Sequence, residues 1–406
     1  MAVAAGLVDL AEVRAARELL SGVIRVTPME GSRPLRALVG GPASLKCENL
    51  QRSGSFKIRG AYVRIARLTD EERRRGVVAA SAGNHAQGVA LAAELLGTEA
   101  TVFMPVLAPL PKVAATRAYG ADVHLVGDTV DAALTVACDY AERTGSILIH
   151  PFDHRDVIAG QGTVGLEVLE QVPDVRTILV CTGGGGLISG IAVAAKALSP
   201  RVRVVGVQAE GAAAWPASLA AGHPVPLASM ATMADGIAVG CPGPVTYAHV
   251  SALVDEILTV SEESISRAQL MLIERAKLVV EPAGAAGVAA ILDQPDRFEP
   301  PVVAVLSGGN MDPILLLRVI QHGMAAAGRY LGIRLRIRDS PGSLAALLRL
   351  LADTGANVVD VEHQRTGPKL HLGEVELALS VETQGADHSA AVLAALRSAG
   401  YSVVLG

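Results

Sequence analysis

Four consecutive glycines and a leucine, Gly183 to Leu187, form the run whose residue types most clearly predict chemistry. An apolar segment at 177–181 precedes them and predicts a strand, and a helix is predicted to begin near Ile188. Glycines let a ligand approach the backbone closely, and their N–H groups with the helix N-terminus make an anion site suited to a phosphate. A tight turn is the alternative, but it needs fewer glycines. Neither a dinucleotide fingerprint nor a Walker A loop fits the run.

Lys57 is a second candidate for chemistry. It lies in Ser-Gly-Ser-Phe-Lys-Ile-Arg-Gly, with an apolar residue on each side. A lysine that loses its water in an apolar pocket has a lowered pKa, and its free amine can then form an imine. A lysine taken alone is more often a solvated surface residue, so both interpretations stay open at this point.

A third candidate is the glycine-flanked turn Ser81 to Gly88, which holds Asn84 and His85. One interpretation is a capped helix start. The other is a nest of backbone donors for a carboxylate. The residues of the turn do not decide between the two.

The segments around these motifs predict a doubly wound α/β fold. Short apolar runs without polar alternation indicate strands buried on both faces, and helices between them indicate parallel pairing. Ligands of such sheets lie beyond the carboxyl ends of the strands, where the glycine-rich motifs fall. The predicted strands are 43–46, 76–80, 101–104, 123–126, 177–181, 202–208 and 302–306.

The chain changes character near residue 322. Residues 322–330 are a predicted linker, and 331–406 predict a ferredoxin-like βαββαβ domain. The first helix of that domain is expected to start at Ser340-Pro341, with serine as N-cap and proline in the first turn. It carries an apolar stripe of Leu344, Leu347, Leu348 and Leu351. The predicted strands are 331–338, 358–362, 374–382 and 402–405, and the second helix is 387–398.

Composition limits the classes of protein. The 406 residues carry a net charge of −5, so no basic excess drives binding to nucleic-acid phosphates. No apolar run approaches the roughly 18 residues of a membrane span, and the N-terminus does not read as a secretory signal. The four cysteines lie far apart without a Cys-x-x-Cys pair, which predicts a cytoplasmic protein without a zinc cluster.

Seven motifs, taken together in chain order, resemble the fold-type II pyridoxal-phosphate enzymes, and the threonine dehydratase (threonine ammonia-lyase) family in particular. The resemblance implies a catalytic domain at 1–321 with two doubly wound parallel-sheet subdomains, the smaller at about 45–150. Residues 331–406 resemble an ACT regulatory domain. The motifs are Glu48-Asn-Leu-Gln51, the Lys57 segment, Ser81 to Gly88, Gly183 to Leu187, Ala234-Asp-Gly-Ile-Ala238, Glu281-Pro-Ala-Gly-Ala-Ala286 and Ser307-Gly-Gly-Asn310.

The resemblance implies pyridoxal phosphate as cofactor and a role for each matching position. Lys57 would hold the cofactor as a Schiff base, and Phe56 would pack against its ring. Asn84 would hydrogen-bond the ring hydroxyl, and Ser307 would face the pyridine nitrogen. The phosphate would bind Gly183, Gly184, Gly185, Gly186 and Leu187. The substrate carboxylate would bind the turn of Ser81, Ala82, Gly83, Asn84 and His85.

The implied reaction is dehydration and deamination of L-threonine to 2-oxobutyrate and ammonia, with L-serine giving pyruvate and Lys57 as general base. A serine racemase, a β-replacement synthase and a non-catalytic amino-acid sensor are the alternatives. Ala82 argues against the racemase, because its methyl has no proton to donate where similar racemases carry a serine. Pro216 stands where related enzymes carry a metal-binding carboxylate, so no metal is predicted.

The ACT resemblance implies an amino-acid effector, isoleucine or valine, at the helix N-terminal amides of the turn Arg338 to Leu344. A dimerisation module without a ligand is the alternative. The resemblance also implies a homo-oligomer, a tetramer or a dimer. The residues do not decide between threonine and serine, nor between isoleucine biosynthesis and catabolism.

Overall fold

The computed structural model describes residues 6–365 and 370–405. The chain divides into two compact units, Met1–Pro313 and Ile314–Gly406. Each unit has an apolar core of its own.

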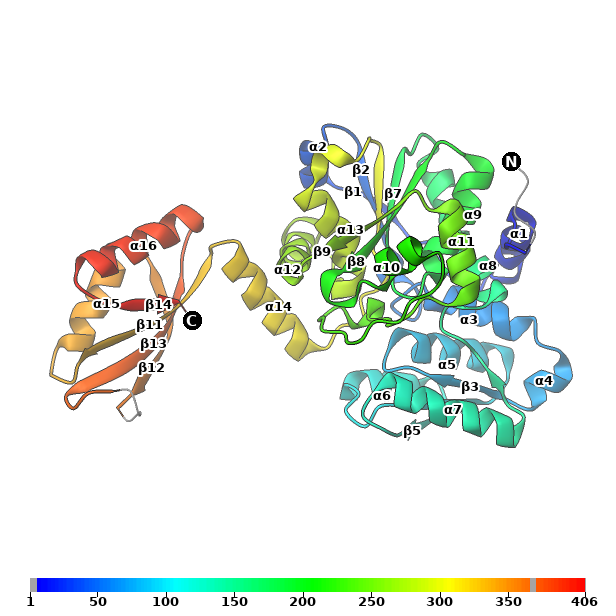
Figure 1. Ribbon diagram of the computed structural model, residues 1–406, viewed down its shortest axis with the longest axis horizontal. Helices are drawn as coiled ribbons and strands as arrows, with labels where there is room; N and C mark the ends of the chain where they lie inside the picture. Colours follow the sequence, from blue (N-terminus) through cyan, green and yellow to red (C-terminus); the bar gives the residue numbers. More distant parts are fainter. Residues whose placement is uncertain (1–5, 366–369, 406) are drawn as a thin grey trace. The chain divides into compact units, whose positions relative to one another are not determined.

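The first unit contains two sheets, and the larger has six strands in the order β1-β2-β10-β7-β8-β9 (Figure 1). All neighbours pair in parallel except β1, which is antiparallel to β2. The register places Val305 beside Lys46 and Val180, so three strands end together and their following loops emerge at one edge. The strands are β1 (Met29–Gly31), β2 (Ala43–Lys46), β7 (Thr177–Cys181), β8 (Arg203–Ala209), β9 (Glu256–Val260) and β10 (Val302–Val305).

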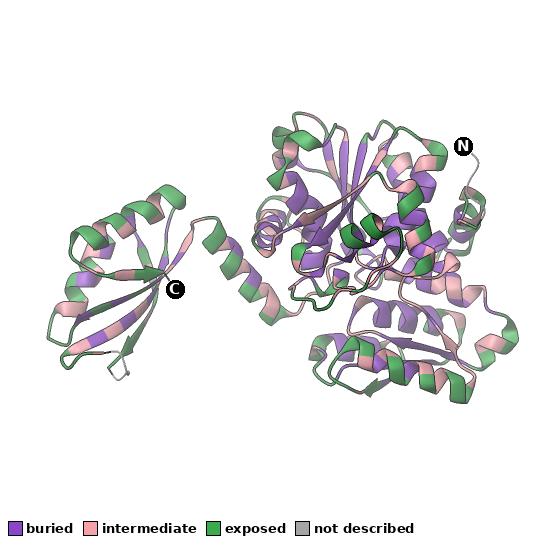
Figure 2. Cartoon of the chain, viewed as in Figure 1, coloured by how far each residue is buried: buried purple, intermediate pink, exposed green. Residues whose placement is uncertain are grey.

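Helices cover both faces of this sheet. Helices α8 (Arg155–Gln171) and α9 (Gly186–Leu198) lie on one side, and α13 (Pro282–Asp293) lies on the other beside α12 (Glu262–Met271). Every residue of β7 and β10 is buried as a result (Figure 2). The prediction of strands covered on both faces is therefore confirmed.

The smaller sheet has four parallel strands in the order β5-β4-β3-β6. Helix α3 (Lys57–Ala66) packs against both α5 and α8 and so links the two subdomains. Residues 45 and 46 belong to β2 of the larger sheet, so the smaller subdomain, expected from about 45, begins after them. The elements of the smaller subdomain are β3 (Val77–Ala80), α5 (Asn84–Leu96), β4 (Ala100–Met104), α6 (Leu110–Ala118), β5 (Asp122–Leu125), α7 (Val130–Thr144) and β6 (Ile147–Leu148).

The second unit begins with helix α14, and the elements after it follow the order βαββαβ, with a sheet in the order β12-β13-β11-β14. All of its strand pairs are antiparallel, which confirms the ferredoxin-like arrangement. Alternate residues of β11 are buried, as in a sheet with one covered face. The elements are α14 (Pro313–Ala326), β11 (Tyr330–Arg338), α15 (Ser343–Asp353), β12 (Asn357–Gln364), β13 (Glu374–Glu382), α16 (Ala386–Ser398) and β14 (Val403–Leu405).

Two boundaries in this region differ from the prediction. Residues 322–326 belong to α14 and are helical instead of linker, because Met324 and the alanines after it are strong helix formers. Helix α15 starts at Ser343 instead of Ser340-Pro341. Gly342 has a φ of 89°, in the left-handed region that a right-handed helix does not include.

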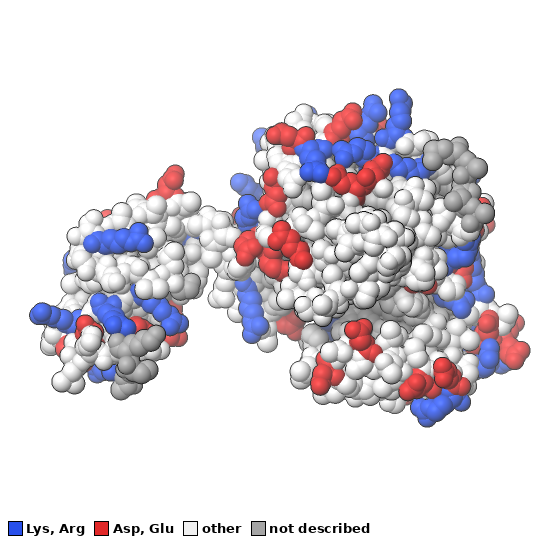
Figure 3. Space-filling model, in the orientation of Figure 1, with Lys and Arg blue, Asp and Glu red and all other residues white. Residues whose placement is uncertain are grey.

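The surface carries mixed charge. On the face shown in Figure 3, Lys and Arg side chains lie among Asp and Glu and do not gather into one basic surface. Within the described ranges, no helix has both the length and the apolar character to cross a membrane.

Candidate active site

Lys57 is the first residue of α3 and is held beside the end of β10. The entering loop is tied to the residues after β10, because Ser55 pairs with Gly308 and the Phe56 N–H donates to the Ser307 carbonyl at 3.1 Å. The Lys57 ammonium donates to the Pro151 carbonyl at 3.0 Å and lies 5.2 Å from the centroid of the Phe56 ring. The loops that follow β2, β10 and β6 therefore meet around Lys57.

The surroundings of Lys57 favour its neutral form. Burial lowers the pKa of Lys57 to about 8, against a smaller opposing effect of Cys181 and Glu281. The hydrogen-bond acceptor of the amine is a neutral carbonyl instead of a carboxylate, so no direct ion pair offsets the desolvation. Lys57 as a whole is half-buried, and its role as a reactive amine stays a prediction.

The glycine run lies between β7 and α9, at the same sheet edge. Gly185 has a φ of 93° and caps α9, a left-handed conformation that glycine adopts without strain. Aromatic side chains pack closely against the run, since a Cβ at Gly184 would meet the Phe152 ring and a Cβ at Gly185 would meet the Trp215 indole. Within the described part of the chain, the backbone amides of Gly183 to Leu187 donate no hydrogen bond. Close packing therefore requires glycines in this run, and its N–H groups remain available for an anion.

Asn84 is the first residue of α5, and both ends of its amide are occupied. Its nitrogen donates to Glu281 at 2.7 Å, and its oxygen accepts from Asn310 at 2.9 Å. Asn310 in turn donates to the Ser53 carbonyl at 2.7 Å. An amide nitrogen has two hydrogens, so Asn84 keeps one for a ligand.

Glu281 is a site residue to which the sequence assigned no role. It is buried, it immediately precedes α13, and its N–H donates to the Gly308 carbonyl at 3.0 Å. Burial and the charge of Asp235 raise the pKa of Glu281 to about 7, against the opposing effects of Lys112, Asn84 and Lys57. A carboxyl directly before a proline that opens an apolar helix is the sequence signal that could have marked it.

Ser307 is buried just beyond β10, and its hydroxyl interacts with the thiol of Cys181, the last residue of β7. Burial raises the pKa of Cys181 to about 11, so the thiol stays protonated at neutral pH. The neighbour of Ser307 on the adjacent strand is therefore a neutral group.

The turn from Ser81 to His85 borders the same region. The Ser81 hydroxyl accepts from the Gly83 N–H at 3.1 Å, and Ala82 is half-buried. The His85 ring is turned away, with Nε2 at 2.7 Å from the Ile149 carbonyl, and burial lowers its pKa to about 3. Only the backbone of His85 is thus left to serve a ligand.

A buried cation stands beside this turn. Lys112 of α6 lies 3.4 Å from the position that a Cβ on Gly83 would take. It forms an ion pair of 2.6 Å with Asp235, which joins the smaller subdomain to the larger one. This pair was also missed from the sequence, because its partners are far apart in the chain.

Metal-binding clusters are absent from the described ranges, in which no group of three or more His, Cys, Asp or Glu side chains is placed to hold an ion.

Comparisons with known proteins agree with this geometry. Residues 20–308 match the family model of pyridoxal-phosphate-dependent enzymes, and residues 332–401 match the ACT domain. An L-threonine ammonia-lyase of Thermotoga maritima is 46% identical over 98% of this chain and 99% of its own length. A threonine deaminase of T.th. has a TM-score of 0.72 at 43% identity, over 75% of this chain and 99% of that one. Maize serine racemase has a TM-score of 0.73 at 39% identity, over 76% of this chain and 96% of the racemase.

The chain belongs to the family of pyridoxal-phosphate-dependent enzymes and carries a C-terminal ACT domain. Its cofactor is pyridoxal phosphate. The residues present fit that group, since the free amides of the glycine run suit its phosphate and the Lys57 amine suits its aldehyde.

Proposed function

We propose that this protein is an L-threonine ammonia-lyase that also accepts L-serine. The observation that carries the proposal is the meeting, at one sheet edge, of a low-pKa lysine and a run of free glycine amides. The relative of Thermotoga maritima, matched over nearly the whole chain, supports the choice of substrate. The overall reaction converts threonine to 2-oxobutyrate and ammonia, and serine to pyruvate and ammonia.

The proposed cofactor contacts are those that the family resemblance implies for these residues. Lys57 would bind the aldehyde, Phe56 would pack against the ring, and the spare amide hydrogen of Asn84 would serve the ring hydroxyl. Ser307 would face the pyridine nitrogen. The amides of Gly183 to Leu187, at the N-terminus of α9, would bind the phosphate.

The proton transfers fall to Lys57. Pyridoxal phosphate, when bound, supplies an electron sink for the bond that breaks at the substrate Cα. The Lys57 amine removes the Cα proton, and its lowered pKa keeps a useful fraction neutral near neutral pH. The turn of Ser81 to His85 holds the substrate carboxylate with backbone N–H groups. The nearby Lys112 ammonium adds favourable charge.

A serine racemase is the second candidate, because maize serine racemase is similar over most of the catalytic unit. Racemisation needs a proton donor on the face of the substrate opposite Lys57. Ala82 offers only a methyl group at the position where the resembling racemases carry a serine. We therefore assign elimination as the main reaction.

The ACT domain is proposed to bind an amino-acid effector, isoleucine or valine, that lowers the affinity for threonine. A pocket lies at the turn before α15, lined by residues that include Arg338, Ser340 and Gly342 of the turn, and His363 and Arg365 of the sheet side. The basic residues and the helix N-terminus suit a carboxylate.

Further assignments complete the proposal. The catalytic domain extends to about residue 313, helix α14 follows it in the chain, and the ACT domain occupies 331–406. The protein assembles as a dimer or tetramer and works in the cytoplasm, where its four free cysteines stay reduced.

The test is 2-oxo acid release from L-threonine and L-serine by purified protein with added pyridoxal phosphate, with chiral analysis of the residual serine. We expect release from both, faster from threonine, and no D-serine. D-serine without pyruvate would instead establish a racemase. Unchanged kinetics at saturating isoleucine and valine would remove the proposed effectors.

A further inference from the structure

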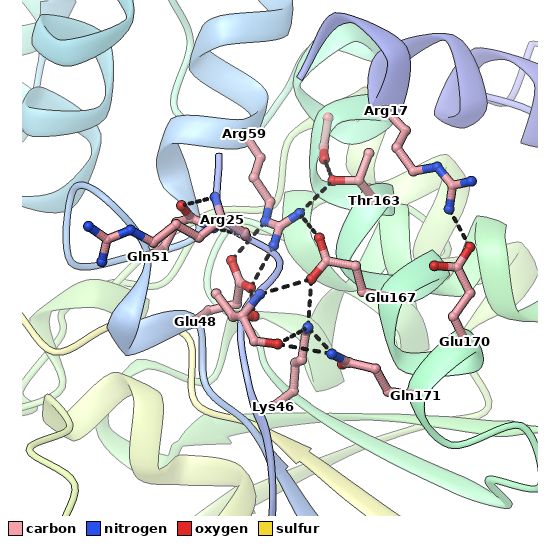
Figure 4. Close-up of polar contacts among 12 residues, drawn as sticks. Arg17, Arg25, Lys46, Glu48, Gln51, Arg59, Thr163, Glu167, Glu170 and Gln171 are labelled. Atoms are coloured by element: carbon pink, nitrogen blue, oxygen red, sulfur yellow. Dashed lines mark hydrogen bonds and ion pairs between the residues drawn. The ribbon is translucent and has the colours of Figure 1, made fainter. Parts of the chain in front are cut away.

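A cluster of buried ionic side chains lies on α3, the helix that begins with Lys57, and on its neighbours (Figure 4). Arg59 of α3 is at its centre. The other members are Glu48, in the turn after β2, Lys46 of β2 and Glu167 of α8. We call these four residues the α3 ion cluster.

The contacts of Arg59 fix its guanidinium in one plane. Its Nε and Nη2 donate to the two oxygens of Glu48, each at 2.8 Å. Its Nη1 donates to Glu167 at 2.6 Å and to the Thr163 hydroxyl at 3.0 Å. A forked pair of this kind is directional, because both bonds hold only at one orientation of the guanidinium.

The outer contacts close the cluster. Lys46 donates to Glu167 at 2.6 Å, to the Thr27 carbonyl at 2.9 Å and to Gln171 at 2.9 Å. The Thr27 hydroxyl donates to Glu48 at 2.5 Å. Two cations and two carboxylates therefore balance in charge, with each carboxylate bonded to more than one donor.

The cluster is removed from water. The side chains of Lys46, Arg59 and Glu48 are fully buried, and that of Glu167 is 6% exposed. Apolar groups of similar volume in such a place are often neutral or better for stability, because buried charges carry a large desolvation penalty. What an ion cluster adds over apolar packing is a fixed orientation of the side chains that form it.

The fixed orientation of Arg59 constrains α3, the helix that also carries the Lys57 amine. Residues two positions apart on a helix are separated by about 200° around its axis, so Lys57 and Arg59 point to opposite sides of the first turn of α3. The same segment that supplies Glu48 is tied to the site, because the Asn49 N–H donates to the Leu306 carbonyl at 2.9 Å, one residue before Ser307. The cluster thus connects the rotation of α3 to the strand end that presents Ser307.

We propose that the α3 ion cluster is a positioning device that sets the rotation of α3 and thereby the place of the Lys57 amine. Arg59, Glu48 and Glu167 are positioning residues in this sense, since none of them reaches the site. The inference rests on the proposed function only for the identity of the reaction that Lys57 serves.

Two variants separate positioning from stability. Glu48→Gln breaks the forked pair and leaves the cluster with an excess positive charge. Glu48→Gln with Arg59→Met removes the pair entirely and leaves Lys46 and Glu167 as a balanced pair. An exposed ion pair that also involves α8, Arg17 with Glu170, supplies the control variant Glu170→Gln (Figure 4).

The expected result is a loss of turnover that does not follow stability. Glu48→Gln should lower the melting temperature, because it leaves a buried charge without its partner. In the double variant, which removes both partners, we expect the melting temperature to return toward that of the wild type. We expect kcat to stay roughly 10- to 100-fold lower, with KM within about threefold. The visible circular dichroism of the bound cofactor should change in both variants and not in Glu170→Gln.

A double variant with wild-type stability, kcat within about twofold of wild type and unchanged dichroism would overturn the proposal. If Glu48→Gln fails to fold, the double variant carries the test alone. If the wild type releases no 2-oxo acid, the proposed function fails separately, and dichroism with the cofactor dissociation constant still decides on the cluster.

Discussion

Lys57 and Arg59 lie two positions apart at the start of α3, and their surroundings shift their pKa values in opposite directions. The Lys57 amine has a neutral carbonyl as acceptor, and burial lowers its pKa to about 8. Burial acts on Arg59 in the same direction, but Glu48 and Glu167 outweigh it and raise the pKa of its guanidinium. The front of the helix holds a cation that can lose its proton, and the back holds one that cannot.

The difference shows that partners, more than burial, decide what a buried cation does. A desolvated amine without a carboxylate partner is available as base and nucleophile. A desolvated guanidinium that is fully bonded by carboxylates becomes a rigid attachment point. Substitution of Lys57 should therefore abolish the reaction itself, whereas substitutions around Arg59 should change where the Lys57 amine is placed.

The largest effect is expected at the front, from Lys57→Ala. Loss of both the attachment point and the base should lower kcat for threonine by at least about 10³-fold. The measurement is 2-oxo acid release with added pyridoxal phosphate. Activity within tenfold of wild type would move the chemistry to another residue. Arg59, which cannot supply a free amine, is not a candidate.

A smaller effect is expected from Lys112→Met, which removes the cation beside the Ser81 to His85 turn. The KM for threonine should rise roughly 3- to 10-fold, with less change in kcat, because the lost charge acts on the bound carboxylate. Asp235→Asn is the matched control, since it keeps the Lys112 charge and should raise KM less. Equal values of KM in wild type and Lys112→Met would exclude this role.

A pH-dependent effect on stability is expected from Glu281, whose pKa is raised to about 7 by burial and by Asp235. The folded protein keeps this proton up to about pH 7, whereas the unfolded chain releases it near pH 4.5. The resulting stabilisation is present at low pH and is lost as the pH rises through about 7. Cofactor-free wild type should therefore lose more free energy of unfolding between about pH 5 and 8 than Glu281→Gln. Identical pH slopes in denaturant titrations would contradict this.

The smallest effect is expected from Glu170→Gln, at the exposed pair with Arg17. Exposed pairs contribute little, because water and salt screen them, so the free energy of unfolding should change by less than about 0.5 kcal/mol. A loss as large as that of Glu48→Gln would erase the distinction between the exposed and the buried pairs that involve α8.

Much of the catalytic fold could be predicted from the sequence, because its signals are local. Apolar runs such as 177–181 mark strands, and consecutive glycines mark an anion loop at a helix start. Interactions between distant segments leave no such mark. Arg59 meets Glu167 across 108 positions, and Lys112 meets Asp235 across 123. The Ser340 helix start was wrong for a local reason, the left-handed conformation of Gly342.

The central claim is that the front of α3 presents the reactive amine at Lys57. The most direct test is borohydride reduction of the protein loaded with pyridoxal phosphate, followed by digestion and mass spectrometry of the peptides. The account predicts that the cofactor mass is fixed on Lys57 and not on the buried Lys46 or Lys112. Label on either of those lysines, with Lys57 unmodified, would contradict it.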